Sequence, residues 1–174
     1  MAYAPGGAPI GAPTAPPAER FLVVHAEGFR LALPLACMRE VLPAPRYTRL
    51  PGTGAEVCGL INLRGQIVTV VDLGARLGLT PAATLPEHGV VIVQYGRTQL
   101  GLAVAAVAGL GSATADELEE TGAALQELEL VHDFVRGAVA DEAGVLIALD
   151  ADALLRPLFA EVGVGGFRHG ADSV

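Results

Sequence analysis

The chain has 174 residues, of which 52% are hydrophobic, and its 19 acidic and 11 basic residues give a formal net charge of −8. A chain of this length and composition can bury a real core, so we expect one globular domain or two small lobes. Nucleic acid and anionic membranes both require a basic surface, so the acidic charge argues against either as a partner.

The first 19 residues are rich in proline, glycine and alanine, which predicts a flexible tail. They contain neither the basic region nor the apolar segment of a secretory signal. The longest apolar run, residues 100–110, is too short to span a bilayer. Cys37 and Cys58 lie among apolar neighbours, as buried reduced thiols do. We therefore expect a cytoplasmic protein with no direct membrane insertion.

From Arg20 onward, short β-branched and leucine-rich runs alternate with turn signals. Hairpins are predicted at Glu27-Gly28 and Gly96-Arg97, because glycine supplies the positive φ that a tight turn requires. The predicted strands are residues 21–26, 29–33, 66–71, 90–95, 98–104 and 145–149. The predicted helices are short and cover residues 72–77, 114–120 and 150–159. Thr114 and Asp150 are the expected N-caps of the last two helices.

The second half of the sequence repeats features of the first. Five apolar positions recur further along the chain at one constant offset: Leu31, Leu33, Leu35, Met38 and Val41 match Leu100, Leu102, Val104, Val107 and Leu110. Arg64-Gly65 before Asp72 also resembles Arg136-Gly137 before Asp150, although the second copy is longer. A chance match in so aliphatic a chain is the alternative. The repeat predicts two related lobes, and closed barrels are favoured because closure removes exposed strand edges. The expected fold class is all-β.

Motifs of enzyme chemistry are missing from the sequence. The four histidines are far apart and have no metal-ligand spacing: His25, His88, His132 and His169. Nucleophile-elbow and phosphate-loop motifs are also missing. We therefore expect no catalytic residues, no metal and no cofactor. A small enzyme using Asp72, Asp150 and His132 in a barrel mouth is the alternative, and no motif supports it.

One segment carries a family resemblance. The sequence GLINLRGQIVTVVDL, residues 59–73, resembles the NLRG-containing signature of CheW-like domains. Upstream, residues 38–41 resemble the family's short segment after the first hairpin. Downstream, residues 90–104 resemble its second hairpin, and residues 135–155 its closing stretch. The resemblance predicts a CheW-like domain over residues 20–160, with residues 161–174 as a C-terminal tail.

Three positions depart from the family pattern. Thr69 stands where proline is usual, Gly74 where an arginine is common, and Ala105 where an acidic residue is usual. The first change should be tolerated, because a strand gains an N–H donor when proline is lost. The other two bear on which partners bind.

The resemblance implies two SH3-like five-stranded β-barrels whose junction forms a groove for the cytoplasmic tip of a chemoreceptor. It implies that another face binds the regulatory domain of a CheA-like histidine kinase, so that the chain is a non-enzymatic chemotaxis adaptor. An adaptor of a pilus-motility or transcription-control system is the alternative. The partner-binding residues that the resemblance implies are Met38, Glu40, Val41, Gly59, Asn62, Arg64 and Gly65.

Arg64 lies in an Asn-x-x-Gly turn between two apolar runs and should project from the surface. Composition alone favours a solvated turn arginine, whereas the resemblance places it at the partner surface. Glu40 is either a partner contact or one half of a surface salt bridge with Arg39 or Arg64. Met38 and Gly59 are either core residues or groove lining.

Overall fold

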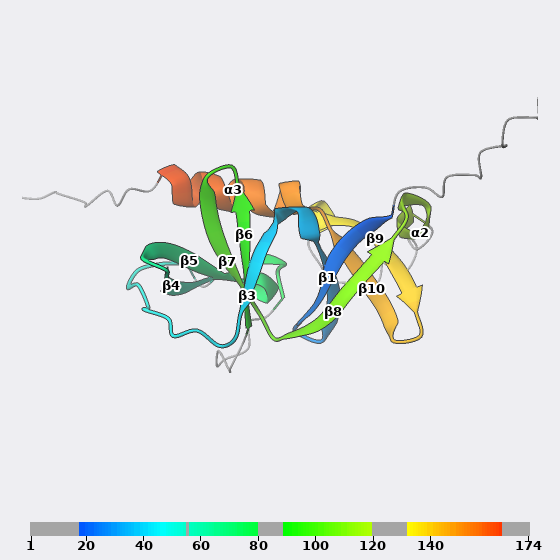
Figure 1. Cartoon of the computed structure of the whole chain (residues 1–174), viewed down its shortest axis with the longest axis horizontal. Coiled ribbons are helices and arrows are strands. Elements are labelled where there is room, and N and C mark those ends of the chain that lie inside the picture. Colours follow the sequence, from blue (N-terminus) through cyan, green and yellow to red (C-terminus); the bar gives the residue numbers. More distant parts are fainter. Residues whose placement is uncertain (1–17, 55, 80–88, 120–131, 165–174) are drawn as a thin grey trace, which may run out of the picture.

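The computed structural model describes residues 18–54, 56–79, 89–119 and 132–164, which form two five-stranded sheets (Figure 1). Lobe A contains β1 (Glu19–Ala26), β2 (Phe29–Pro34), β8 (Ala106–Ala113), β9 (Val135–Asp141) and β10 (Gly144–Leu149). Lobe B contains β3 (Met38–Leu42), β4 (Val57–Leu63), β5 (Gln66–Asp72), β6 (Gly89–Tyr95) and β7 (Thr98–Val104). The helices are α1 (Leu73–Arg76), α2 (Ala115–Glu119) and α3 (Ala151–Val164), and two 3-10 turns are η1 (Leu35–Cys37) and η3 (His132–Phe134). The all-β prediction with two five-stranded lobes is confirmed.

All six predicted strands are present, but β3, β4, β8 and β9 were not identified as strands from the sequence. The sequences of β8 and β9 are rich in alanine and glycine, which have low strand propensity, so their pairing depends on their neighbours. Helix α3 runs to Val164, into the segment predicted as a tail. Glycines follow it in the sequence, as they commonly do after a helix end. No helix in the described part of the chain is long and apolar enough to cross a membrane.

Each lobe receives one strand from the chain segment that follows the other lobe's hairpin. Along the chain β3 follows β2 of lobe A but pairs with β6 of lobe B, whereas β8 follows β7 of lobe B but pairs with β1 of lobe A. The sheet orders are β8-β1-β2-β10-β9 and β3-β6-β7-β5-β4. β2 and β7 thus hold the same place in their sheets, and so do β3 and β8. These are the strands that the sequence repeat matches.

The predicted correspondence of Arg64-Gly65 with Arg136-Gly137 is wrong. Arg136-Gly137 lies inside β9 and does not form a turn equivalent to Arg64-Gly65. The glycine of β4 that matches Gly137 is Gly59, because the interval from Gly59 to the capping Asp72 equals the interval from Gly137 to the capping Asp150. The length difference between the two copies then disappears.

Both matched glycines admit a close backbone neighbour. A Cβ at Gly59 would lie 2.5 Å from the carbonyl oxygen of Thr48, which pairs with Leu60 as an isolated bridge. A Cβ at Gly137 would collide with the carbonyl oxygen of Leu118 in α2. Each lobe therefore needs glycine at this place in the strand.

Side-chain caps begin the short helices. Asp72 and Asp150 each accept a hydrogen bond through Oδ1 from the backbone N–H three residues later, both at 2.9 Å. Thr114 and Glu117 form a capping box, in which the Thr114 N–H donates to Glu117 Oε2 at 2.7 Å and Thr114 Oγ1 accepts from the Glu117 N–H. The predicted N-caps Asp150 and Thr114 are both confirmed.

The largest hydrophobic core lies between the lobes. It combines Leu31 and Leu33 of lobe A, Leu100 and Leu102 of lobe B, and the α3 leucines Leu154, Leu155 and Leu158. Each lobe also has a smaller core of its own on the opposite face of its sheet. Helix α3 packs against β6 and β7, so it covers one side of the shared core. The lobes are held together by buried apolar surface, which fixes the relative positions of sites on each.

Candidate partner-binding site

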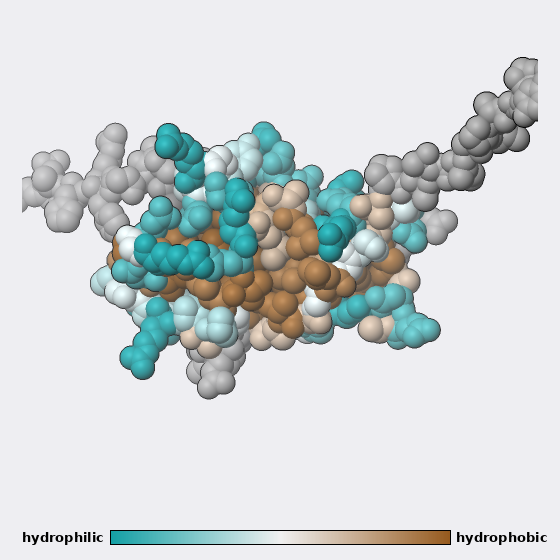
Figure 2. Space-filling view, in the orientation of Figure 1, coloured by the Kyte–Doolittle hydropathy of each residue, from teal (hydrophilic) through white to brown (hydrophobic). Residues whose placement is uncertain are grey.

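An apolar strip lies at the junction of the lobes, where the end strands β3 and β8 meet. We define the junction strip as Val41 of β3 with Val107 and Leu110 of β8, whose exposed fractions are 40%, 38% and 63%. Gly89 of β6 has neighbours from both of these strands, because a Cβ placed on it would lie 3.8 Å from the Val107 side chain and 3.8 Å from the Leu42 carbonyl oxygen. The adjoining ends of β3 and β8 therefore lie close together. Figure 2 shows apolar surface that runs continuously across the middle of the molecule in this region.

Strand register explains why the strip is apolar. Val41 pairs with Val91, Val107 with Val24 and Leu110 with Leu22, and all three of these partners belong to the shared core. Directly paired residues point to the same face of a sheet, so the strip is the uncovered rim of that core. Contiguous exposed apolar surface is typical of interaction sites, so the strip is a candidate partner-binding surface.

The β4–β5 turn presents Arg64. Leu63 pairs with Gln66, and the two turn residues Arg64 and Gly65 have φ of 51° and 87°, the backbone signs of a type I′ hairpin turn. Asn62 Oδ1 accepts a hydrogen bond of 2.8 Å from the Gly65 N–H, which holds the turn closed. The Arg64 side chain is 78% exposed, as the sequence predicted.

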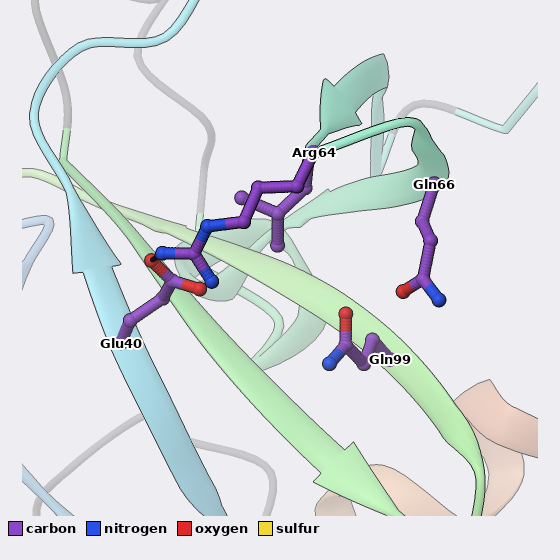
Figure 3. A pocket seen from close by; sticks show the side chains of 5 residues that line it. Glu40, Arg64, Gln66 and Gln99 are labelled. Carbon is purple, nitrogen blue, oxygen red and sulfur yellow. Dashed lines mark hydrogen bonds and ion pairs between the residues drawn. The ribbon is translucent and has the colours of Figure 1, made fainter.

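Glu40 and Arg64 form an ion pair, in which Arg64 Nη2 donates to Glu40 Oε2 at 2.9 Å (Figure 3). Of the two salt bridges expected for Glu40, this one is present, while Arg39 Nε donates to Gln94 Oε1 at 2.6 Å. An exposed pair of this kind typically contributes about 1 kcal/mol or less to folding. Its main effect is to aim the guanidinium of Arg64 across the end of lobe B.

The ion pair borders a small pocket, which we call the Arg64 pocket. It is lined by Glu40, Leu63, Arg64, Gln66 and Gln99 and has a volume of about 240 Å³. Figure 3 shows side chains from β3, the β4–β5 hairpin and β7 converging on this space. Small-molecule and cofactor sites usually measure about 300–1,000 Å³, so the pocket suits one side chain of a partner better than a cofactor.

The structure distributes the predicted site residues over several places. Glu40, Asn62, Arg64 and Gly65 lie together at the Arg64 pocket and its turn, and Val41 lies in the junction strip. Met38 packs partly buried against the shared core. Gly59 is buried beside Thr48, so its visible role is in packing. A part for each residue in partner binding stays a prediction.

Sequence reasoning missed five residues of these surfaces: Leu63, Gln66 and Gln99 of the pocket, and Val107 and Leu110 of the strip. Val107 and Leu110 are the repeat partners of Met38 and Val41, so the repeat itself contained the signal for the strip. Gln99 of β7 had no signal in the sequence, because only the packed structure shows its amide in the pocket.

The described cysteines and helix-capping aspartates have the following environments. Burial, followed by the charge of Asp72, raises the pKa of the Cys58 thiol to about 12, and burial also raises the pKa of Cys37. Thiols with raised pKa values are poor nucleophiles. Asp72 and Asp150 are occupied as helix caps. Among the described residues, no group of three or more His, Cys, Asp or Glu side chains could hold a metal ion.

Comparison with known proteins identifies the family of the chain. The CheW-like domain model matches residues 20–158. The chain belongs to this family. It is 32% identical over 117 residues to the "Probable chemotaxis protein CheW" of Rhizobium etli, covering 67% of this chain and 74% of that protein. It is also 33% identical over 98 residues to "Protein PilI" of Pseudomonas aeruginosa, covering 53% of this chain and 55% of that protein.

A solved structure of the CheW-like family has the same fold. The crystal structure of the scaffolding protein TtCheW from Thermoanaerobacter tengcongensis aligns with a TM-score of 0.65 at 23% identity. The alignment covers 76% of this chain and 88% of that protein. The two-lobe architecture described above is therefore that of a CheW-like domain.

Proposed function

We propose that the chain is a non-enzymatic cytoplasmic adaptor that couples chemoreceptors to a CheA-like histidine kinase. The observation that carries this proposal is the presence of two separate surfaces, the junction strip and the Arg64 pocket, on two lobes that share one hydrophobic core. Val41 and Glu40 are consecutive in β3 and so point to opposite faces of the sheet. Two partners can therefore meet β3 from different sides.

The junction strip suits the receptor. Recognition of a helix by an apolar surface uses side chains repeated along one helix face, and Val41, Val107 and Leu110 offer a matching uncharged surface. The strip is the rim of a core that already holds both lobes together. A receptor helix bound there would complete the cover that α3 provides on lobe B.

The Arg64 pocket suits the kinase regulatory domain. Its guanidinium is exposed and its carboxylate partner is fixed, so a polar partner surface meets a preformed charge arrangement. Charge-assisted hydrogen bonds of arginine are among the stronger and more directional contacts at interfaces. No chemistry is needed from the adaptor itself: it holds the receptor and the kinase in register, so that a change in one biases the other.

A pair of matched variants tests the assignment of the junction strip. Leu110 and Ile67 are both exposed apolar strand residues, at 63% and 65%, but only Leu110 lies in the strip. Leu110→Asp places a charge in the strip and should weaken binding of a chemoreceptor hairpin fragment at least about tenfold. Ile67→Asp should bind the fragment as the wild type does. Equal losses in both variants, or none in either, would exclude the strip as the receptor site.

A second output is favoured by the similarity to "Protein PilI". The same two surfaces would then join a receptor and a kinase of a pilus-motility system. Capture of partners from lysate of the source organism, followed by mass spectrometry, separates the two systems by the receptor and kinase that are recovered. The matched variants above apply unchanged to either receptor.

A further inference from the structure

The Arg64 pocket contains a buried oxygen atom with no hydrogen-bond partner. Gln99 Oε1 is buried and accepts no hydrogen bond from the described residues. Figure 3 shows this oxygen pointing into the space between Arg64 and Gln66. Buried polar atoms are nearly always paired, and an unpaired one calls for an explanation such as a ligand that supplies the partner.

The neighbouring glutamine on the same face shows the contrast. Gln94 pairs with Gln99 in the β6–β7 ladder, and both of its amide atoms are used. Gln94 Oε1 accepts from Arg39 Nε and Gln94 Nε2 donates to the Gly96 carbonyl, both at 2.6 Å. The strand pattern alone therefore does not leave a glutamine unpaired at this end of lobe B.

Besides the Gln66 amide and the Glu40–Arg64 ion pair, the pocket offers two groups that complement each other. Gln99 Oε1 needs a donor, while Arg64 has five N–H donors and uses one nitrogen, Nη2, on Glu40. The ion pair leaves no net charge between Arg64 and Glu40. A partner group that fits must therefore be neutral and must carry both a donor and an acceptor.

We propose that the Arg64 pocket receives the primary carboxamide of an Asn or Gln side chain from the kinase regulatory domain. The amide nitrogen donates to Gln99 Oε1 and the amide oxygen accepts from Arg64. This inference rests on the proposed adaptor function and names the chemistry of one of its contacts. The kinase is assigned here because the pocket and the junction strip use opposite faces of β3.

Other side chains fit the pocket less well. A lysine ammonium has no acceptor for Arg64 and is repelled by it, whereas a carboxylate has no donor for Gln99 and competes with Glu40 for the guanidinium. A hydroxyl has a donor and an acceptor, but on one atom. Gln99 lies in β7 and Arg64 in the β4–β5 turn, so the acceptor and the donor of the pocket are separate in space. This arrangement suits the two separate polar atoms of a carboxamide.

The test compares Gln99→Met with Gln94→Met in the full chain. Methionine keeps the length of glutamine but cannot supply the amide oxygen. Titration calorimetry with the purified kinase regulatory domain should show affinity about tenfold lower for Gln99→Met, because the partner amide is left without an acceptor. The melting temperature of this variant should not fall, since the Gln99 side chain makes no hydrogen bond with the described residues that could be lost. Gln94→Met should lose melting temperature and keep its affinity for the kinase domain.

A double-mutant cycle then identifies the partner residue. Each Asn and Gln on the surface of the kinase domain is replaced by Leu and measured against the wild type and Gln99→Met. The residue in the pocket is the one whose replacement causes no additional loss with Gln99→Met. If the wild type binds the kinase domain and Gln99→Met binds equally well, or if no coupled amide residue exists, the carboxamide inference is wrong. If the wild type binds neither kinase domain nor receptor fragment, the adaptor function itself is wrong.

Discussion

Arg64 combines an exposed charged side chain with a backbone in the left-handed region, where φ is 51°. The sequence predicted its exposure from the Asn-x-x-Gly pattern, because that pattern closes tight turns. The sequence left its partner open, since Arg39 and Arg64 are both compatible with Glu40. Only the pairing of β3 with β6 and of β4 with β5 determines which arginine reaches the carboxylate.

Arg64→Ala should weaken binding of the kinase regulatory domain at least about tenfold while leaving folding stability within about 0.5 kcal/mol of the wild type. The stability change is small because the side chain is 78% exposed and its ion pair is screened by solvent. Arg156→Ala is the matched control, because Arg156 is 66% exposed and pairs with Asp152 in α3. Calorimetry and thermal unfolding on both variants check this. A loss of stability in Arg64→Ala without loss of affinity would assign Arg64 a purely structural role.

The raised pKa of the Cys58 thiol predicts that the free energy of unfolding depends on pH. The folded pKa of the thiol is raised from 9.0 to about 12, so the folded state holds this proton more tightly than the unfolded state does. The stability contribution is complete below pH 9 and is lost as the pH rises from about 9 towards 12. Tyr47, whose pKa is raised from 10.0 to about 12 mainly by burial, adds to the loss above pH 10.

Urea unfolding between pH 8 and pH 10 measures this effect. In the Cys58→Ala variant, the decline of the unfolding free energy between pH 9 and pH 10 should be shallower than in the wild type. Identical slopes in the two proteins would show that the thiol does not couple to folding in this range. Native Cys58 should also resist alkylation at pH 8, because the reactive thiolate is scarce and the residue is buried.

At the level of secondary structure, turn and cap signals were the reliable parts of the sequence. Gly28 and Gly96 have positive φ in their hairpins, and Asp150 and Thr114 cap their helices. These signals are local, since each depends on a few consecutive residues. Strands β8 and β9 were missed because they are held by cross-strand pairing with β1 and β10, which a single window of sequence does not contain.

Gly59→Ala should destabilise the fold by roughly 2 kcal/mol or more, because two costs combine. Its φ of 144° is unfavourable for a residue with a side chain, and the new Cβ would lie 2.5 Å from the Thr48 carbonyl oxygen. Gly54→Ala is the control, since a Cβ there has no neighbour within 4 Å. Urea denaturation of the two variants provides the comparison. Equal stabilities would show that the Thr48–Leu60 bridge can move away at little cost.

Over the whole molecule, the exchange of β3 and β8 between lobes creates the candidate receptor surface. Val41 and Leu110 are far apart in the sequence, and the exchange brings their strands to the same junction. The repeat predicted two related lobes and even matched these two residues to each other. It did not predict that their strands lie at the same junction, because a repeat specifies equivalence between lobes and not which lobe each strand joins.

The separation of the two surfaces predicts that both partners bind at the same time. Receptor hairpin fragment, adaptor and kinase regulatory domain should form one complex in size-exclusion chromatography with light scattering. Because the junction strip and the Arg64 pocket lie on opposite faces of β3, saturation with one partner should change the affinity for the other by less than about fivefold, the lower end of typical allosteric coupling.

Single-surface variants make this prediction specific. Leu110→Asp should lose the receptor fragment and retain the kinase domain, and Arg64→Ala should do the reverse. Each variant then serves as the folding control for the other, because each keeps one binding activity. Competition between the two partners for the wild-type adaptor would mean that their binding sites overlap across β3. Such a result would rule out the adaptor as a bridge built on these two faces, since a bridge must hold both partners together.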